Sequence, residues 1–196
     1  MVDEGLIYFK DGKQLVEVGD TKIYKMNGQL FLEIGSGHTL WALESEIQDY
    51  MEQLSDLPKG NCLEIGLGLG VASRYILTFP KVVHLTTVEI NSNVIEAHSL
   101  IEEASRGLQL DYNSCKHTII CSDGLEYMFT TKNKYDFIFI DCYDRIDEET
   151  LPMIADMYVA SQRILKPNGK IVAWLDKYTP EVYYKQFESI FSQGFY

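Results

Sequence analysis

Glycines follow an apolar run at two places in the chain, and either place could turn the backbone around a nucleotide. Residues 32–37 have the sequence LEIGSG and residues 63–68 the sequence LEIGLG, and Gly70 adds a third glycine to the second. Without a Cβ the backbone can turn sharply from strand to helix and approach a ligand closely. A helical stretch and another apolar strand follow the second segment, whereas an amphipathic helix follows the first. We therefore predict that Gly66, Gly68 and Gly70 form the ligand loop, and that the first segment is a strand end and turn.

An acidic residue stands where a nucleoside-binding loop needs one. Glu89 ends the second apolar strand, 23 positions after Gly66, and an acid placed there can bind two ribose hydroxyls. A solvated acid at a strand end is the alternative interpretation of Glu89. Gly70 comes one position early for the dinucleotide fingerprint, which argues against NAD, and no Walker lysine follows, which excludes P-loop nucleotide hydrolysis.

The composition narrows the class of protein and partner. The 196 residues carry a net charge of −12, which disfavours nucleic acid, because non-specific binding rests on Lys and Arg neutralising phosphate. No apolar run approaches the roughly 20 residues that cross a bilayer, and the first residues lack the basic start of a signal peptide. We expect no membrane partner, a cytoplasmic location and a small-molecule substrate. The four cysteines and four histidines show no metal-ligand spacing, so no metal is expected.

The pattern of apolar residues divides the chain near Pro58. Residues 1–57 indicate β-hairpins that begin with a strand at residues 6–9 and include an Asn-Gly turn at 27–28. A helix follows from about residue 44 to residue 54, with Ile47, Tyr50, Met51 and Leu54 on one apolar face. The edges of these strands could cover the site or pair with another subunit, so a homodimer is possible. Residues 58–196 alternate near-continuous apolar strands with helices, and the last of these strands is expected at residues 171–175. This alternation predicts an α/β fold, a Rossmann-like open and mostly parallel sheet.

The predicted loop resembles a known cofactor motif. Residues 63–70 resemble motif I of class I S-adenosylmethionine-dependent methyltransferases, and residues 88–91 resemble their acidic second-strand motif. Residues 165–170 are similar to the approach to their fifth strand. The resemblance covers roughly residues 60–176 and implies binding of S-adenosylmethionine or a close relative. Glu64 would then bind the cofactor amine, or alternatively cap backbone amides near the loop.

Within that superfamily the chain is most similar to the spermidine synthases. Residues 121–128 resemble their Asp-Gly motif, which implies that Asp123 and Gly124 meet the adenine end of the cofactor. Asp123 could instead cap the helix that follows. Residues 135–144 resemble their catalytic strand, which ends in Asp-x-x-Asp. The resemblance implies that Asp141 takes a proton from the attacking amine.

The remaining candidates lie around that strand end. The resemblance makes Asp144 the second acid of the pair, although residues 144–149 also have the composition of an exposed charged loop. Tyr143 could line the acceptor pocket. Asp141 itself could be a structural acid in a turn. A carboxylate at the end of a buried strand suits general-base chemistry, since the acceptor amine must lose a proton.

Several positions depart from the spermidine synthase pattern. Leu69 replaces the Asp that binds the cofactor amine in that family, and residues 46–52 do not reproduce its polyamine-holding segment. Arg145 stands where the family has Pro, and the sixth and seventh strands are missing or rudimentary. We therefore rank methyl transfer to a small molecule first. Aminopropyl transfer from decarboxylated S-adenosylmethionine to a polyamine is second, and a non-catalytic cofactor-binding domain is third.

Overall fold

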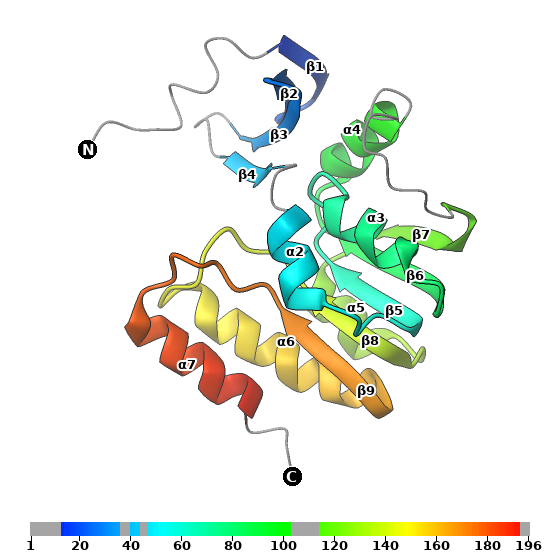
Figure 1. Ribbon diagram of the computed structural model, residues 1–196, viewed down its shortest axis with the longest axis vertical. Helices are drawn as coiled ribbons and strands as arrows, with labels where there is room; N and C mark the ends of the chain where they lie inside the picture. The colour runs from blue at the N-terminus through cyan, green and yellow to red at the C-terminus, as the bar shows by residue number, and fades with distance from the viewer. Residues whose placement is uncertain (1–12, 36–39, 44–46, 103–113, 193–196) are drawn as a thin grey trace.

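The structure, a computed structural model, describes residues 13–35, 40–43, 47–102 and 114–192 (Figure 1). It begins with an antiparallel sheet in the order β1-β2-β3-β4. These strands are β1 (Lys13–Val18), β2 (Thr21–Met26), β3 (Gln29–Ile34) and β4 (Leu40–Leu43). Asn27 and Gly28 have φ values of 50° and 84° at the β2–β3 turn, which is the left-handed backbone that an Asn-Gly hairpin requires. A further strand expected at residues 6–9 lies outside the described residues.

A helix and a parallel sheet follow, and they confirm the Rossmann-like prediction. The strands are β5 (Gly60–Ile65), β6 (Val82–Glu89), β7 (His117–Cys121), β8 (Tyr135–Ile140) and β9 (Leu165–Ala173). The helices are α2 (Ile47–Leu54), α3 (Val71–Thr78), α4 (Ser92–Glu102), the 3₁₀ turn η2 (Ser114–Lys116), α5 (Gly124–Thr130), α6 (Thr150–Ile164) and α7 (Glu181–Ser192). Each neighbouring pair in the five-stranded sheet is parallel.

The strand order β7-β6-β5-β8-β9 explains where a ligand can bind. The chain builds outward from β5 to β7, then returns to the other side of β5 with β8. Open α/β sheets bind ligands outside the carboxyl ends of the strands at such a switch point. Residues 137–140 of β8 are fully buried, which is why the strand has an unbroken apolar sequence.

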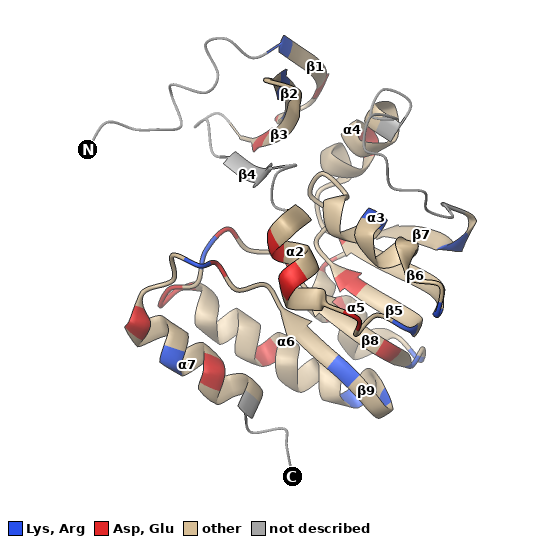
Figure 2. Ribbon diagram, viewed as in Figure 1, with Lys and Arg blue, Asp and Glu red and all other residues tan. Residues whose placement is uncertain are grey.

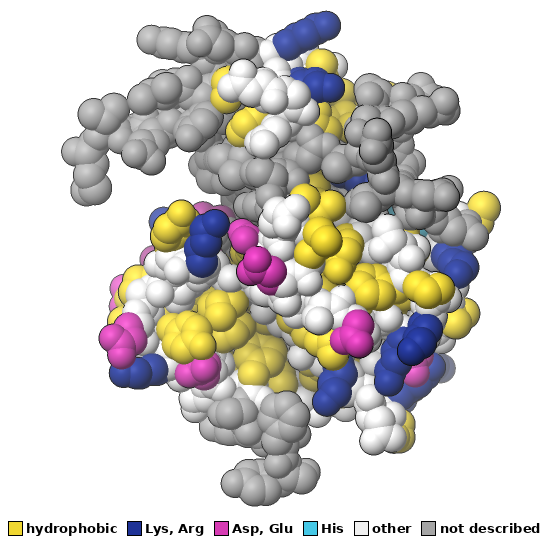
Figure 3. Space-filling view, in the orientation of Figure 1, with side chains coloured by type: hydrophobic (Ala, Val, Ile, Leu, Met, Phe, Trp, Pro, Cys, Tyr) yellow, Lys and Arg dark blue, Asp and Glu magenta, His cyan; other side chains and the backbone are white. Residues whose placement is uncertain are grey.

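Helices cover both faces of the parallel sheet (Figure 1). α3 packs on β6 beside α2, while α6 packs on β8 and β9 and contacts α5 and α7. Hydrophobic side chains gather on the surface over α6 and α7 (Figure 3). The ring centroid of Phe191 on α7 lies 4.9 Å from that of Tyr158 on α6 and 4.8 Å from that of Phe187 on α7. The Tyr158–Phe191 contact joins the last helix to α6, whereas the Phe187–Phe191 contact lies within α7.

Two details of the fold differ from the sequence pattern. β9 begins at Leu165, six residues before the predicted start at residue 171, because its pairing with β8 continues through a register shift. On α2, Met51 is 44% exposed although it shares the predicted apolar face with the buried Tyr50 and Leu54. No helix among the described residues is both long enough and apolar enough to span a bilayer.

Candidate functional site

A cavity of about 370 Å³ opens at the carboxyl ends of β5, β6 and β8. The N-terminal part also contributes to its wall, through Leu32 and Ile34 of β3 and Tyr50 of α2. The predicted site residues that line the cavity are Gly66, Gly68, Glu89, Asp123, Gly124, Asp141, Tyr143 and Asp144. The structure thus gathers most of the predicted set, although its members lie up to 78 positions apart (144 minus 66) in the chain.

The glycine loop lies directly against the segment that follows β8. The amide of Asp141 donates to the carbonyl of Ile65 at 2.8 Å, and that of Gly66 donates to Val88 at 2.9 Å. Gly66 has a φ of 97°, and a Cβ at this position would overlap with the carbonyl oxygen of Asp141. Only glycine therefore allows β5, β6 and β8 to meet this closely at the floor of the cavity.

Glu89 joins the end of β6 to the loop after β5. Its Oε2 accepts a hydrogen bond from the amide of Leu67 at 2.9 Å, and its Oε1 accepts from the amide of Asn91 at 2.8 Å. A carboxylate offers about four acceptor positions, so these two bonds leave capacity for hydroxyl donors in the cavity. The predicted geometry, with the loop and Glu89 facing one space from adjacent parallel strands, is present.

Asp141 receives a hydrogen bond that the sequence analysis missed. The Tyr50 hydroxyl donates to Asp141 Oδ2 at 2.9 Å, across 91 residues of chain. The Tyr50 ring is 6% exposed and lies 4.6 Å from the Trp174 ring. A buried tyrosine hydroxyl usually finds a hydrogen-bond partner. This rule could have predicted a hydrogen bond for Tyr50 from the sequence. Helical periodicity assigned Tyr50 to an apolar face and left its polar atom without a role.

Tyr143 and Asp144 lie at different depths of the cavity wall. Tyr143 is 7% exposed, and its hydroxyl donates to the carbonyl of Trp174 at 2.6 Å. Burial holds the pKa of Tyr143 well above its usual value, so the group is a neutral donor, and its ring rather than its hydroxyl is available to a ligand. Asp144 is exposed and lines the cavity.

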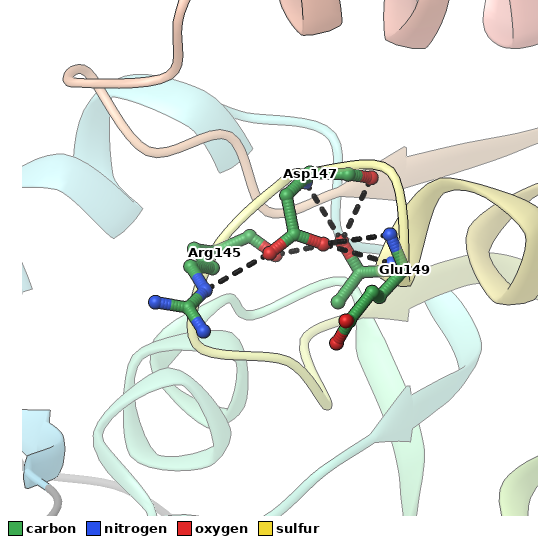
Figure 4. Close-up of polar contacts among 4 residues, drawn as sticks. Arg145, Asp147 and Glu149 are labelled. Carbon is green, nitrogen blue, oxygen red and sulfur yellow. Dashed lines mark hydrogen bonds and ion pairs between the residues drawn. The ribbon is translucent and has the colours of Figure 1, made fainter.

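The charged loop after Asp144 is ordered by its own contacts (Figure 4). Arg145 Nε contacts Asp147 Oδ2 at 2.9 Å, and Asp147 Oδ1 accepts from the amides of Glu149 and Thr150 at 3.0 Å. These hydrogen bonds lower the pKa of Asp147. The loop therefore has a structural role at the start of α6, separate from that of Asp144.

Asp123 caps a helix and also faces the cavity. Its Oδ1 accepts from the amide of Glu126 at 2.8 Å at the start of α5, so the capping interpretation is confirmed. A Cβ at Gly124 would overlap with the side chain of Ile65, which keeps this turn close to β5.

The structure corrects two of the predicted cofactor contacts. Gly70 lies off the cavity wall, where it precedes α3 with a φ of 68° and packs against the buried His98. Glu64 is also absent from the wall. It is buried behind the loop, where Ser73 Oγ and Thr87 Oγ1 donate to its Oε2, and Thr87 in turn contacts His117 Nε2 at 2.7 Å. Alternation along β5 turns Glu64 away from the cavity, and its hydrogen-bond donors are the Ser73 and Thr87 hydroxyls, not backbone amides of the loop.

The buried Glu64 makes stability depend on pH. Burial raises its pKa to about 8, against about 4.3 in an unfolded chain. Between these values the folded protein keeps a proton that the unfolded chain has released, so stability falls as pH rises. Glu64→Gln should reduce this slope, by up to about 1.4 kcal/mol per pH unit, because the amide does not titrate. The fold should be kept, since the amide oxygen can still accept from Ser73 and Thr87. Urea unfolding at pH 5, 6.5 and 8 measures the slope, and equal slopes in both proteins would contradict the assignment.

Residues 50–191 match the family model described as the spermine/spermidine synthase domain. The chain belongs to this family. The match begins at Tyr50, and so it includes the second half of α2, residues 50–54, together with the parallel sheet. The resemblance to the spermidine synthase branch of the methyltransferase superfamily is confirmed.

Individual relatives of this synthase-domain chain agree with the match. This chain is 31% identical over 145 residues to a polyamine aminopropyltransferase of Saccharolobus islandicus, and the alignment covers 70% of this chain and 47% of that protein. A polyamine aminopropyltransferase of Methanocaldococcus jannaschii is 30% identical over 143 residues, covering 70% and 46%. The chain therefore spans about half the length of these curated relatives.

Solved structures support the fold. Spermidine synthase from Thermotoga maritima superimposes with a TM-score of 0.68 at 20% identity, over 92% of this chain and 63% of that one. A putative methyltransferase from Streptococcus mutans gives 0.58 at 16% identity, over 92% and 47%. The family match does not support methyl transfer, so the ranking of methyl transfer first is corrected.

Proposed function

We propose that this synthase-domain chain transfers an aminopropyl group from decarboxylated S-adenosylmethionine to an amine of a small polyamine-like acceptor. The main structural support is the position of the Asp141 carboxylate, which lines the cavity beside the glycine loop and accepts a hydrogen bond from Tyr50. Its relatives named polyamine aminopropyltransferase support the choice of reaction.

The residues present fit the nucleoside half of such a donor. Glu89 has free acceptor positions for ribose hydroxyls, while Gly66 and Gly68 bring the backbone of the loop to the cavity surface. Asp123 and Gly124 form the neighbouring wall, where we place the adenine. Glu64 and Gly70 are not part of this proposed set.

The reactive half of the cavity is acidic. Asp141 and Asp144 line it, and the described lining residues include no Lys or Arg. Figure 2 shows acidic residues on α2, whereas the lysines of β9 lie before the carboxyl end of that strand. Such a field favours cationic amines over anions. Leu69 also lines the cavity, but its side chain is apolar and 3% exposed and supplies no charge. We therefore propose that Asp141 and Asp144 supply the negative charge that binds a cationic ligand.

The chemistry required of the chain is proton removal and orientation. A bound sulfonium donor supplies an activated carbon and a neutral thioether leaving group. The amine must be unprotonated to attack, and Asp141 can take its proton while Tyr50 holds the carboxylate in place. The new bond joins the amine nitrogen to the propyl carbon, and the carbon–sulfur bond breaks. Holding the two reactants together supplies much of the acceleration in reactions of this kind.

Calorimetry and a transfer assay test the proposal together. We expect decarboxylated S-adenosylmethionine and methylthioadenosine to bind, and we expect putrescine or spermidine to gain an aminopropyl group, detected by mass spectrometry. Tighter binding of S-adenosylmethionine with transfer of a methyl group would overturn the proposal. Nucleoside binding without any transfer would leave the non-catalytic alternative.

Glu89→Ala should weaken methylthioadenosine binding by at least ~1.5 kcal/mol, or more than tenfold, because charge-assisted hydrogen bonds to the ribose are lost. The substitution also frees the Leu67 amide, so thermal unfolding should be measured alongside calorimetry. Glu96→Ala, at an exposed position on α4 outside the cavity, is the control. Unchanged affinity in a folded Glu89→Ala protein would show that the ribose is elsewhere.

A further inference from the structure

We propose that Gln53 is a positioning residue, whose side-chain amide ties α2 to the chain after β9 and thereby holds the Tyr50 hydroxyl at Asp141. The inference rests on the proposed function, since it concerns the group that we assign as the base. Gln53 does not line the cavity, so it acts through Tyr50.

The tie consists of two reciprocal hydrogen bonds. Gln53 Nε2 donates to the carbonyl of Leu175 at 2.9 Å, and the amide of Leu175 donates to Gln53 Oε1 at 2.9 Å. One primary amide therefore satisfies both backbone groups of a residue 122 positions away, as a neighbouring strand would. Among side chains, only Asn and Gln carry a donor and an acceptor side by side in this form.

The tied segment is the one against which Tyr50 packs. Tyr50 and Gln53 are three residues apart and so share a face of α2. The ring of Tyr50 lies 4.6 Å from that of Trp174, the residue before Leu175. The amide of Trp174 donates to the carbonyl of Ile140 at 2.8 Å, which places this segment beside Asp141. Gln53 thus links the helix that carries the phenol to the strand end that carries the carboxylate.

The helix needs such a link. α2 has eight residues, and helices this short are marginal in water without tertiary contacts. A second contact, Lys177 Nζ to Asp49 Oδ2 at 3.7 Å, is long and joins an exposed lysine to a half-buried aspartate, so it contributes little. The Gln53 bonds are partly buried and directional, so we assign the orientation of α2 mainly to them and to the Tyr50 ring contacts.

Loss of the tie should impair transfer while leaving nucleoside binding intact. We expect Gln53→Leu to lower kcat about tenfold or more, and Gln53→Glu, which keeps the acceptor but loses the donor, to give a smaller loss. Methylthioadenosine affinity should stay within twofold, because we assign the nucleoside wall to the loop after β5, the end of β6 and the start of α5, and not to α2. The control is Gln48→Leu, at an exposed position on the same helix, which should retain wild-type kcat.

A double-mutant cycle identifies the route of the effect. If Gln53 acts through Tyr50, Gln53→Leu should change kcat less than twofold in a Tyr50→Phe background. The acid limb of the pH–rate profile should move to higher pH in both single variants, since each weakens hydrogen bonding to the Asp141 carboxylate. Glu64 on β5 and Cys142 and Tyr143 after β8 interact electrostatically with this carboxylate, and Glu89, Asp123 and Asp144 line the same cavity. These groups are unchanged across the cycle. Additive losses, or full activity in Gln53→Leu, would overturn the inference.

An optical measurement separates this inference from the proposed function. The chain has two tryptophans, so a Trp41→Phe background leaves Trp174 as the only reporter beside Tyr50. Gln53→Leu should change its emission, whereas Gln48→Leu should not. This result is expected even if the protein transfers no group. An unchanged Trp174 emission would show that α2 stays in place without Gln53, and the inference would fail.

Discussion

Asp141→Asn should lower kcat for amine transfer by about 10²- to 10⁴-fold, the usual contribution of a general base. The amide has nearly the same shape as the carboxylate, and its oxygen can still accept from the Tyr50 hydroxyl. What it loses is the capacity to take a proton from the acceptor amine. Initial rates at saturating donor and acceptor measure the change.

Nucleoside affinity and a control variant show whether the loss of kcat comes from the missing base. Methylthioadenosine affinity should change less than threefold, because Asp141 is assigned to the acceptor and not to the ribose. Asp156→Asn, at an exposed position on α6 outside the cavity, is the matched control and should retain wild-type rates. A loss of less than tenfold in Asp141→Asn would mean that another group, with Asp144 the first candidate, accepts the proton.

Gly66→Ala should lower the free energy of unfolding by about 2 to 5 kcal/mol. Part of this, about 1 to 2 kcal/mol, comes from placing an L-residue in left-handed backbone. The remainder comes from overlap of the new methyl group with the Asp141 carbonyl, at the roughly 1 to 3 kcal/mol typical of overpacking. Because that carbonyl belongs to the proposed base, residual folded protein should also be poorly active.

Gly28→Ala separates the two contributions. Gly28 has a similar φ of 84°, but a Cβ there has no neighbour within 4 Å. We therefore expect it to lose only the backbone part when both variants are unfolded in urea. Equal losses in the two variants would show that the chain after β8 can move away from the loop, and that this contact does not fix the site.

The local sequence determined the framework of this protein. Unbroken apolar runs such as residues 137–140 identified strands buried on both faces, and Asn27-Gly28 identified a hairpin. The spacing of Gly66 and Glu89 placed a ligand loop and an acid on adjacent strands, and the structure has them there. These features are encoded by neighbouring residues, since burial, turn geometry and strand alternation act over a few positions.

The same local information was insufficient where a side chain had two possible directions. Glu64 and Gly70 belong to the motif, yet one points behind the loop and the other packs on His98. The motif predicts which residues form the turn, but only the tertiary structure shows which of them face the cavity.

Tertiary structure alone decided the surroundings of Asp141. The Tyr50 hydroxyl reaches it from 91 positions away, and the Gln53 amide reaches Leu175 from 122. Each pair depends on α2 packing beside the ends of β8 and β9. Helical periodicity predicts which face of a helix is buried, but it does not predict which distant residue that face contacts. Asp141 was therefore predictable as an acid at a strand end. Its hydrogen-bond donor, and the residue that holds that donor, became visible only when the sheet brought these segments together.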